Sequence, residues 1–211
     1  MDVVLILSSI SSQLSPFIFT NVLLPLMKKT AQDPNADVRI VIVSSMTHAL
    51  IKETHFSSRE DLKVSYEGES YDSMKRYACS KLANILWTKE LARRLALSTG
   101  DGGSRIIVIT LHPGGTLSEG LAETFPGIFP RILRPIVSLG LRLAAYTPTQ
   151  GAYNSTFAAA SPKVRQEAAI YNGAFLVPGQ KLGKPSKLAC DEKLAKDLWE
   201  LQESVLKEEG I

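Results

Sequence analysis

Two short runs of almost uninterrupted β-branched and aliphatic residues set the strongest limit on how this chain can fold. The first is VRIVIVSS, Val38 to Ser45, and the second is RIIVITL, Arg105 to Leu111. Runs of this kind are typical of strands that are buried on both faces, as in a parallel sheet. A third short strand is expected at Ala174 to Val177, and the apolar run Val3 to Leu7 is a further candidate.

Segments with helical patterns lie between and after these runs. Phe17 to Lys29 ends on basic residues, and Asp191 to Glu208 has the apolar positions Leu194, Leu198, Trp199 and Val205. The helix expected at Arg76 to Leu97 has apolar residues at helical spacing: Ala78, Leu82, Ile85, Leu86, Ala92 and Leu95. Other large side chains are expected in the core: Trp87, Met27 and Met46. The alternation predicts an α/β fold of the doubly wound type, with right-handed crossovers between parallel strands.

The totals fit one domain and exclude several classes of protein. The 211 residues, 45% of them hydrophobic, suffice for a single globular core. A net charge of +3 with scattered basic residues argues against nucleic acid as a partner. Cys79 and Cys190 lack the spacing of a zinc site or disulfide framework, so we expect no metal and a reduced, cytoplasmic compartment. Residues 46–75 are polar without clear periodicity, and we expect a long connection there.

One segment near the start carries a membrane signal. No charged side chain occurs from Val3 to Met27, and about 20 apolar residues are enough to cross a bilayer. The segment also contains five serines between Ser8 and Ser15. We therefore interpret the segment from Val3 to Met27 as a strand and a helix of a globular fold. A membrane-crossing helix is the alternative.

Tyr77 and Lys81 are the first candidates for chemistry. Four residues apart on the expected helix, they lie on one face and close enough to interact. An ammonium group near a phenol favours its ionised form, which suits proton transfer near neutral pH. Ser44-Ser45 and His112-Pro113-Gly114 follow the two strongest strands, and ligands bind at the carboxyl ends of strands in open α/β sheets. We expect His48 and His112 to have structural roles, and His55 to face solvent.

With these motifs in place, the chain resembles the short-chain dehydrogenase/reductase superfamily, and within it the branch of retinol dehydrogenases and WW-domain oxidoreductases. The matching stretches are LSPFIFTNVLLPLMKKT, DVRIVIVSSMTH, YACSKLANILWTKELARRL, RIIVITLHPGGTLS and TPTQGAYNSTFAA. The resemblance implies a Rossmann-type sheet. It also implies an NAD(P)-dependent oxidoreductase that interconverts an alcohol and a carbonyl.

The resemblance assigns roles to individual residues. Tyr77 would exchange a proton with the substrate oxygen, Lys81 would assist it and bind the nicotinamide ribose, and Ser45 would polarise the carbonyl. The cofactor-binding residues implied are Tyr77, Lys81, Pro113, Gly114, Thr116 and Ser118. NADP(H) is favoured over NAD(H), with a small lipophilic alcohol or carbonyl as substrate and a homodimer as the assembly.

The resemblance also divides the chain. Residues 1–211 would form a single, partial NAD(P)-binding domain with a divergent N-terminus at 1–13, the polar insertion at 46–75 and a substrate-binding region at 119–170. Within the last region, Phe125 to Tyr146 is apolar yet carries three arginines. We expect this segment to form a lipophilic lid or to contact a membrane surface, giving peripheral membrane association.

The chain departs from the family pattern at its start. Its first glycine is Gly68, so no glycine-rich turn precedes the Val38 strand, and Ser12 stands where the family has a catalytic asparagine. We therefore expect an N-terminally truncated fold in which the Val38 strand has an exposed apolar edge. The alternative function is a catalytically inactive homologue that acts as an interaction or dimerisation module.

Overall fold

The computed structural model describes residues 13–63, 72–115, 131–144 and 146–210. The α-helices are α2 (Ser15–Ala31), α3 (Asp72–Ala96), α5 (Arg134–Ala144), α6 (Pro148–Ala160), α7 (Pro162–Gln166), α8 (Ala168–Tyr171) and α9 (Glu192–Glu209). The strands are β1 (Arg39–Val43), β2 (Ile107–Leu111), β3 (Phe175–Val177) and β4 (Lys181–Leu182). Short 3-10 helices are η2 (Met46–Leu50), η3 (Arg59–Lys63), η4 (Gly103–Arg105) and η5 (Leu188–Cys190). The candidate strand Val3 to Leu7 lies outside the described residues.

The four strands form one sheet in the order β1-β2-β3-β4. β1 and β2 pair in parallel from Arg39 opposite Ile107 to Val43 opposite Leu111, and β3 continues the parallel sheet beside β2. The predicted parallel arrangement is therefore confirmed for these three strands. β4 differs, because a tight turn with positive φ at Gly179 and Gln180 returns the chain antiparallel to β3.

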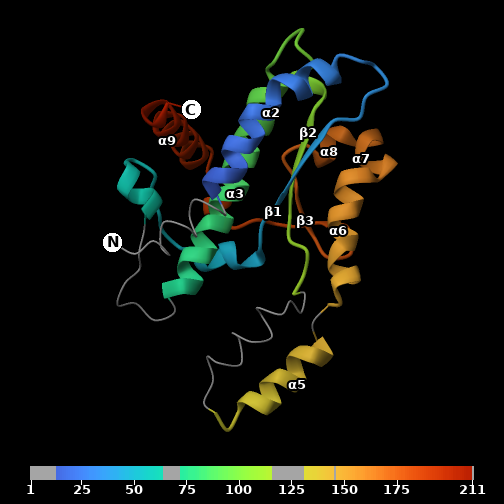
Figure 1. Cartoon of the computed structure of the whole chain (residues 1–211). Coiled ribbons are helices and arrows are strands. Elements are labelled where there is room, and N and C mark those ends of the chain that lie inside the picture. Colours follow the sequence, from blue (N-terminus) through green and yellow to red (C-terminus); the bar gives the residue numbers. More distant parts are fainter. Residues whose placement is uncertain (1–12, 64–71, 116–130, 145, 211) are drawn as a thin grey trace.

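Helices cover both faces of the sheet, as the doubly wound prediction requires (Figure 1). α2, α3 and α9 lie on one side, whereas α6, α7 and α8 lie on the other. β2 contributes to both hydrophobic cores because successive side chains on a strand point to opposite faces. Val108 belongs to the core under α3, while Ile107, Ile109 and Leu111 belong to the core under α6. The alternating strands and helices thus build the predicted mixed α/β fold.

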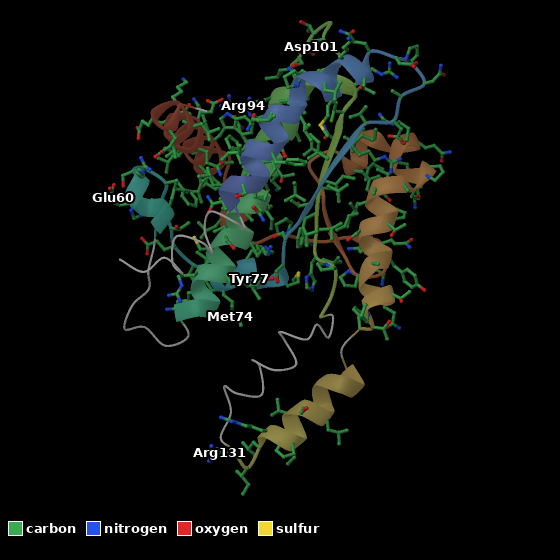
Figure 2. The ribbon with its side chains drawn as sticks, viewed as in Figure 1. Glu60, Met74, Tyr77, Arg94, Asp101 and Arg131 are labelled. Atoms are coloured by element: carbon green, nitrogen blue, oxygen red, sulfur yellow. The ribbon has the colours of Figure 1, made fainter. Side chains whose placement is uncertain are left out.

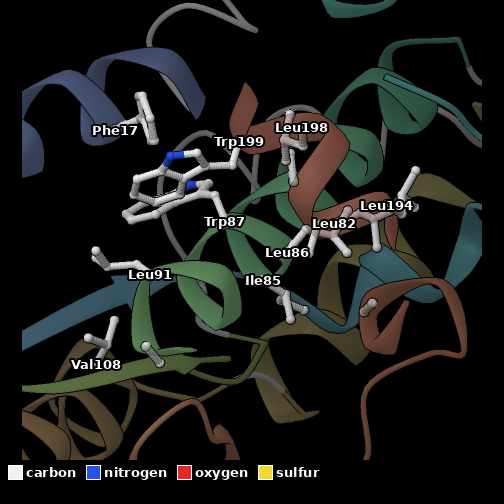
Figure 3. Close-up of a cluster of buried hydrophobic side chains, with 14 of the residues drawn as sticks. Phe17, Leu82, Ile85, Leu86, Trp87, Leu91, Val108, Leu194, Leu198 and Trp199 are labelled. Atoms are coloured by element: carbon white, nitrogen blue, oxygen red, sulfur yellow. The ribbon is translucent and has the colours of Figure 1, made fainter. Parts of the chain in front are cut away.

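Helix α3 forms the centre of the larger core. Each apolar position predicted from its helical spacing is buried, with at most 5% of the residue exposed: Ala78, Leu82, Ile85, Leu86, Ala92 and Leu95. Trp87 is fully buried and packs edge-on against Phe17 of α2, which also contacts Trp199 of α9 (Figure 3). Three helices are therefore joined through one aromatic side chain.

Two sequence expectations need correction. The Val38 strand is not buried on both faces, since Val41 is half-buried and Val43 is 45% exposed. β1 lies at the edge of the described sheet, so the exposed apolar edge expected from a truncated fold is confirmed among the described residues. Met46 is 45% exposed and not a core residue, since it begins the turn that leaves the sheet.

Within the described residues, no helix combines the length and apolar character needed to cross a membrane.

Ion pairs close the amino end of the sheet. Asp37, just before β1, accepts hydrogen bonds from Arg39 and from Arg165 of α7. The Arg39 guanidinium, aided by Arg165, lowers the pKa of Asp37 to about 2. Arg39 also donates to the backbone oxygens of Ala158 and Ser161. This network connects β1 to the helices on the α6 side, at the end of the sheet opposite the candidate site.

We predict that Phe17→Ala lowers the free energy of unfolding by about 3–5 kcal/mol, because it leaves a cavity between α2, α3 and α9. Phe19→Ala is a matched control on the same helix, since Phe19 is 67% exposed, and should change stability by less than about 0.5 kcal/mol. Urea unfolding of the two variants measures the difference. Equal losses would contradict the assignment of Phe17 as the joint between the helices.

Candidate active site

Tyr77 and Lys81 lie one turn apart in the amino-terminal half of α3, which packs against η2. Figure 2 labels Tyr77 on this helix. Tyr77 is 41% exposed, and the Lys81 Nζ atom lies 5.4 Å from the centroid of its ring. The ammonium also donates to the Val43 carbonyl oxygen at 3.3 Å. Burial lowers the pKa of Lys81 below its usual value of 10.5, since the protein disfavours the charged form. The predicted contact between the two side chains is present.

The two serines after β1 have different surroundings. Ser44 extends the sheet, because its N–H donates to the Leu111 oxygen and its hydroxyl donates to the Lys81 oxygen at 2.7 Å. Ser45 is 7% exposed and caps η2, its Oγ atom accepting from the Thr47 N–H at 3.2 Å. This capping bond uses a lone pair of Oγ and leaves the hydroxyl hydrogen for another acceptor. Ser45 therefore combines a structural bond with donor capacity at the rim of the sheet.

His48 fixes the turn that carries Ser45. The ring is fully buried, with Nδ1 2.6 Å from the Ser45 oxygen and Nε2 accepting from the Ser186 N–H at 3.0 Å. A backbone N–H can only donate, so Nε2 is unprotonated and Nδ1 carries the hydrogen. Burial lowers the pKa of His48 and keeps the ring neutral. The expected structural role of His48 thus has a specific form, a bridge between the turn after β1 and the segment before η5.

The second rim element follows β2. His112 continues the ladder by donating to the Leu176 oxygen, and Asn154 of α6 donates to the His112 oxygen at 2.9 Å. Gly114 has a φ of +104°, and a Cβ atom there would lie 2.3 Å from the Tyr146 ring. Only glycine fits this position without a shift of its neighbours. Thr116 and Ser118, the remaining predicted cofactor-binding residues, lie outside the described residues.

The structure brings the strongest sequence candidates to one edge. Ser45, Tyr77 and Lys81 come from the turn after β1 and from the helix packed on it. Pro113 and Gly114 follow β2 at the same carboxyl edge, because β1 and β2 are parallel. Sequence reasoning gave no role to Asn154, although it lies in the stretch TPTQGAYNSTFAA. The sequence signal that could have identified Asn154 is a polar amide on a helix face whose other residues are small and apolar. In the structure Asn154 is only 2% exposed.

We predict that the stability of the fold falls between pH 7.5 and 5.5, and that His48 causes much of the fall. The folded-state pKa of His48 is below the usual 6.5, so the unfolded chain binds a proton first as the pH decreases. The stabilisation is complete above about pH 6.5 and is lost as the pH falls through the folded-state pKa. His112, whose pKa is lowered by burial and by His48, contributes in the same direction. Urea unfolding at both pH values measures the fall.

His48→Gln keeps a terminal amide in the site without a titratable ring. This variant should lose about 1 kcal/mol at pH 7.5, the scale of one hydrogen bond, and show a smaller decrease at pH 5.5. His55→Gln is the control, because the His55 side chain is 75% exposed and its ion pair with Asp61 is therefore worth at most about 1 kcal/mol, so this variant should keep most of the fall. An unchanged pH dependence in His48→Gln would refute the role of His48.

Comparison with known proteins finds relatives that are described as short-chain dehydrogenase/reductases or as a retinol dehydrogenase. No family model matches the chain. A short-chain dehydrogenase/reductase of Armillaria gallica is 35% identical over 201 residues, which cover 95% of this chain and 61% of the relative. One of Macrophomina phaseolina is 35% identical over 69% of this chain and 66% of the relative. Mouse (Mus musculus) retinol dehydrogenase 14 is 35% identical over 91% of this chain and 50% of its own length. The chain thus spans about half to two thirds of these relatives.

Proposed function

This chain belongs to the short-chain dehydrogenase/reductase family, and from that premise we propose that it serves the nicotinamide-dependent interconversion of an alcohol and a carbonyl. The observation that carries the proposal is the pairing of Tyr77 with Lys81. The Lys81 Nζ atom lies 5.4 Å from the Tyr77 ring centroid, and Lys81 also donates to the last residue of β1. An exposed phenol beside a half-buried ammonium has the chemistry of a proton-transfer couple.

In the proposed reaction each side chain has one task. The Tyr77 hydroxyl donates a proton to the substrate oxygen during reduction and accepts it during oxidation. The Lys81 ammonium stabilises negative charge on that phenol, and the Ser45 hydroxyl donates to the same substrate oxygen. A nicotinamide, when bound, supplies or accepts the hydride.

The residues present match one end of such a cofactor better than the other. Lys81 offers an ammonium toward a ribose, and Pro113 and Gly114 offer backbone at the rim beside it. No glycine precedes Gly68, so residues 1–67 contain no glycine-rich turn for a pyrophosphate, and we assign no residue to that group. Family membership implies NAD(P), and we propose NADP(H) over NAD(H) from the resemblance to the retinol dehydrogenase branch.

We propose a small lipophilic alcohol or carbonyl as the substrate. A relative described as retinol dehydrogenase 14 supports a lipophilic molecule. In the described part of residues 119–170, which we propose to bind the substrate, large aliphatic side chains are exposed, among them Ile136 and Leu139. Such side chains can cover an apolar molecule at the rim of the sheet.

We predict that Tyr77→Phe lowers kcat by about 10²- to 10⁴-fold, since it removes the hydroxyl that exchanges the proton. The assay follows NADPH oxidation with all-trans-retinal and then with a panel of lipophilic aldehydes. Tyr153→Phe is the matched control, because Tyr153 is 59% exposed on α6, and it should retain full turnover. Undiminished turnover by Tyr77→Phe would eliminate Tyr77 as the proton donor.

A second candidate function is an interaction module that forms a homodimer without turnover. The observation that favours it is a stripe of exposed apolar residues on one face of α2: Phe19, Val22 and Leu26, each more than 60% exposed. Residues at this spacing lie on one side of a helix and suit a helix-to-helix contact.

Val22→Asp with Leu26→Asp should convert such a dimer to monomers, as measured by light scattering after gel filtration. A monomeric unmodified chain, or a dimer that persists in the double variant, would count against this module. Turnover by the unmodified chain that depends on Tyr77 would favour the enzyme instead.

A further inference from the structure

Helix α5 stands apart from the rest of the described structure (Figure 1, yellow). Arg131 is labelled at its amino end in Figure 2, far from Tyr77 on α3. α5 packs extensively against no other described helix or strand. Nevertheless, four large aliphatic residues are exposed on α5 and just before it: Ile132 at 84%, Leu133 at 43%, Ile136 at 69% and Leu139 at 59%.

The helix separates apolar residues from polar ones. Successive residues of an α-helix are rotated by about 100°, so Ile136 lies about 200° around the axis from Arg134. Leu139 is on the Ile136 side, whereas Ser138 is one turn beyond Arg134. Gly140 also borders the apolar side, and a Cβ atom placed there would meet nothing within 4 Å. The apolar side of α5 is therefore open.

The charge of this region has one sign. Between Glu123 and Lys163 the sequence contains three arginines, Arg131, Arg134 and Arg142, and no aspartate or glutamate. Arg131 and Arg134 are both exposed at the amino end of α5. An open aliphatic side combined with basic residues and no acidic ones is the pattern of helices that lie on anionic membranes.

We propose that residues 131–140, the α5 surface, dock on an anionic lipid membrane, with α5 lying in the plane of the interface. The eleven residues of α5 extend about 16 Å and cannot cross a hydrocarbon layer of about 30 Å. A second copy of the chain is a poorer occupant, since it would bring the same arginines together without acidic counterparts on the segment. The aliphatic side chains enter the acyl region while the guanidinium groups remain at the headgroups.

This inference goes beyond the proposed oxidoreductase function, because vesicle binding needs neither Tyr77 nor Lys81. Ile136 and Leu139, proposed above to cover the substrate, would here contact lipid, so the test measures vesicle binding and not turnover. Membrane docking would nevertheless help the proposed reaction if the substrate is lipophilic. A membrane concentrates such molecules, and the α5 surface would hold the chain where they are dissolved.

Vesicle sedimentation tests the proposal with the full chain. The probes are unilamellar vesicles of phosphatidylcholine alone and of phosphatidylcholine with phosphatidylserine at three to one. We expect binding to the mixed vesicles that is at least about tenfold stronger than to neutral ones, and weaker in high salt because ions screen the headgroup charge. Ile136→Asp with Leu139→Asp should lower binding to the mixed vesicles by about tenfold or more.

Leu97→Asp with Ile170→Asp is the matched control, since it adds the same two charges to exposed aliphatic residues, 69% and 54% exposed, that belong neither to the α5 surface nor to the α2 stripe. It should leave vesicle binding unchanged, and circular dichroism confirms that both double variants are folded. The proposal is overturned if the unmodified chain fails to bind the mixed vesicles, if it binds neutral vesicles equally well, or if the two double variants behave alike. Gel filtration that shows the α5 variant alone losing a dimer, without vesicle binding by the unmodified chain, would assign the surface to a protein contact instead.

Discussion

The burial of helix α3 is the constraint on which the rest of the structure depends. α3 packs against β1, β2 and α9, so its apolar residues meet the sheet on one side and a second helix on the other. Its rotation about its own axis is consequently fixed. Tyr77 and Lys81 gain their place at the sheet rim from this packing, because the same rotation that buries Leu82 and Ile85 turns Tyr77 outward. Position at the site is a by-product of core packing.

Much of this arrangement could be predicted from the sequence. The spacing of apolar residues identified the buried side of α3 and α9, since a helix buried on a defined side requires that period. The β-branched runs identified β1 and β2, although β1 is shorter than predicted at both ends and β2 begins two residues later than predicted. The pair at 77 and 81 was predicted from helical geometry alone. The structure confirms the contact between these two side chains. The roles assigned to all of the site residues, including Thr116 and Ser118, remain predictions.

Other features could not be predicted, for physical reasons. β4 has two residues, and its existence depends on a turn at Gly179 and Gln180 rather than on a hydrophobic pattern. The bond from Lys81 to the Val43 oxygen and the bond from Asn154 to the His112 oxygen join elements distant in sequence. The spacing of residues within one helix or strand cannot predict such hydrogen bonds between distant segments.

The bridge made by His48 has a consequence for the order of events during protein synthesis. Ser186 follows His48 by 138 residues, yet its N–H is one of the two hydrogen-bond partners of the buried ring. While the ribosome is still translating the intervening chain, the His48 imidazole lacks the Ser186 N–H as a donor. The turn that carries Ser45 is then held by only one of the two hydrogen bonds of this ring. Contacts between such remote positions form late because a long loop must close first. The rim of the sheet therefore takes its final shape only after the chain has emerged through Ser186.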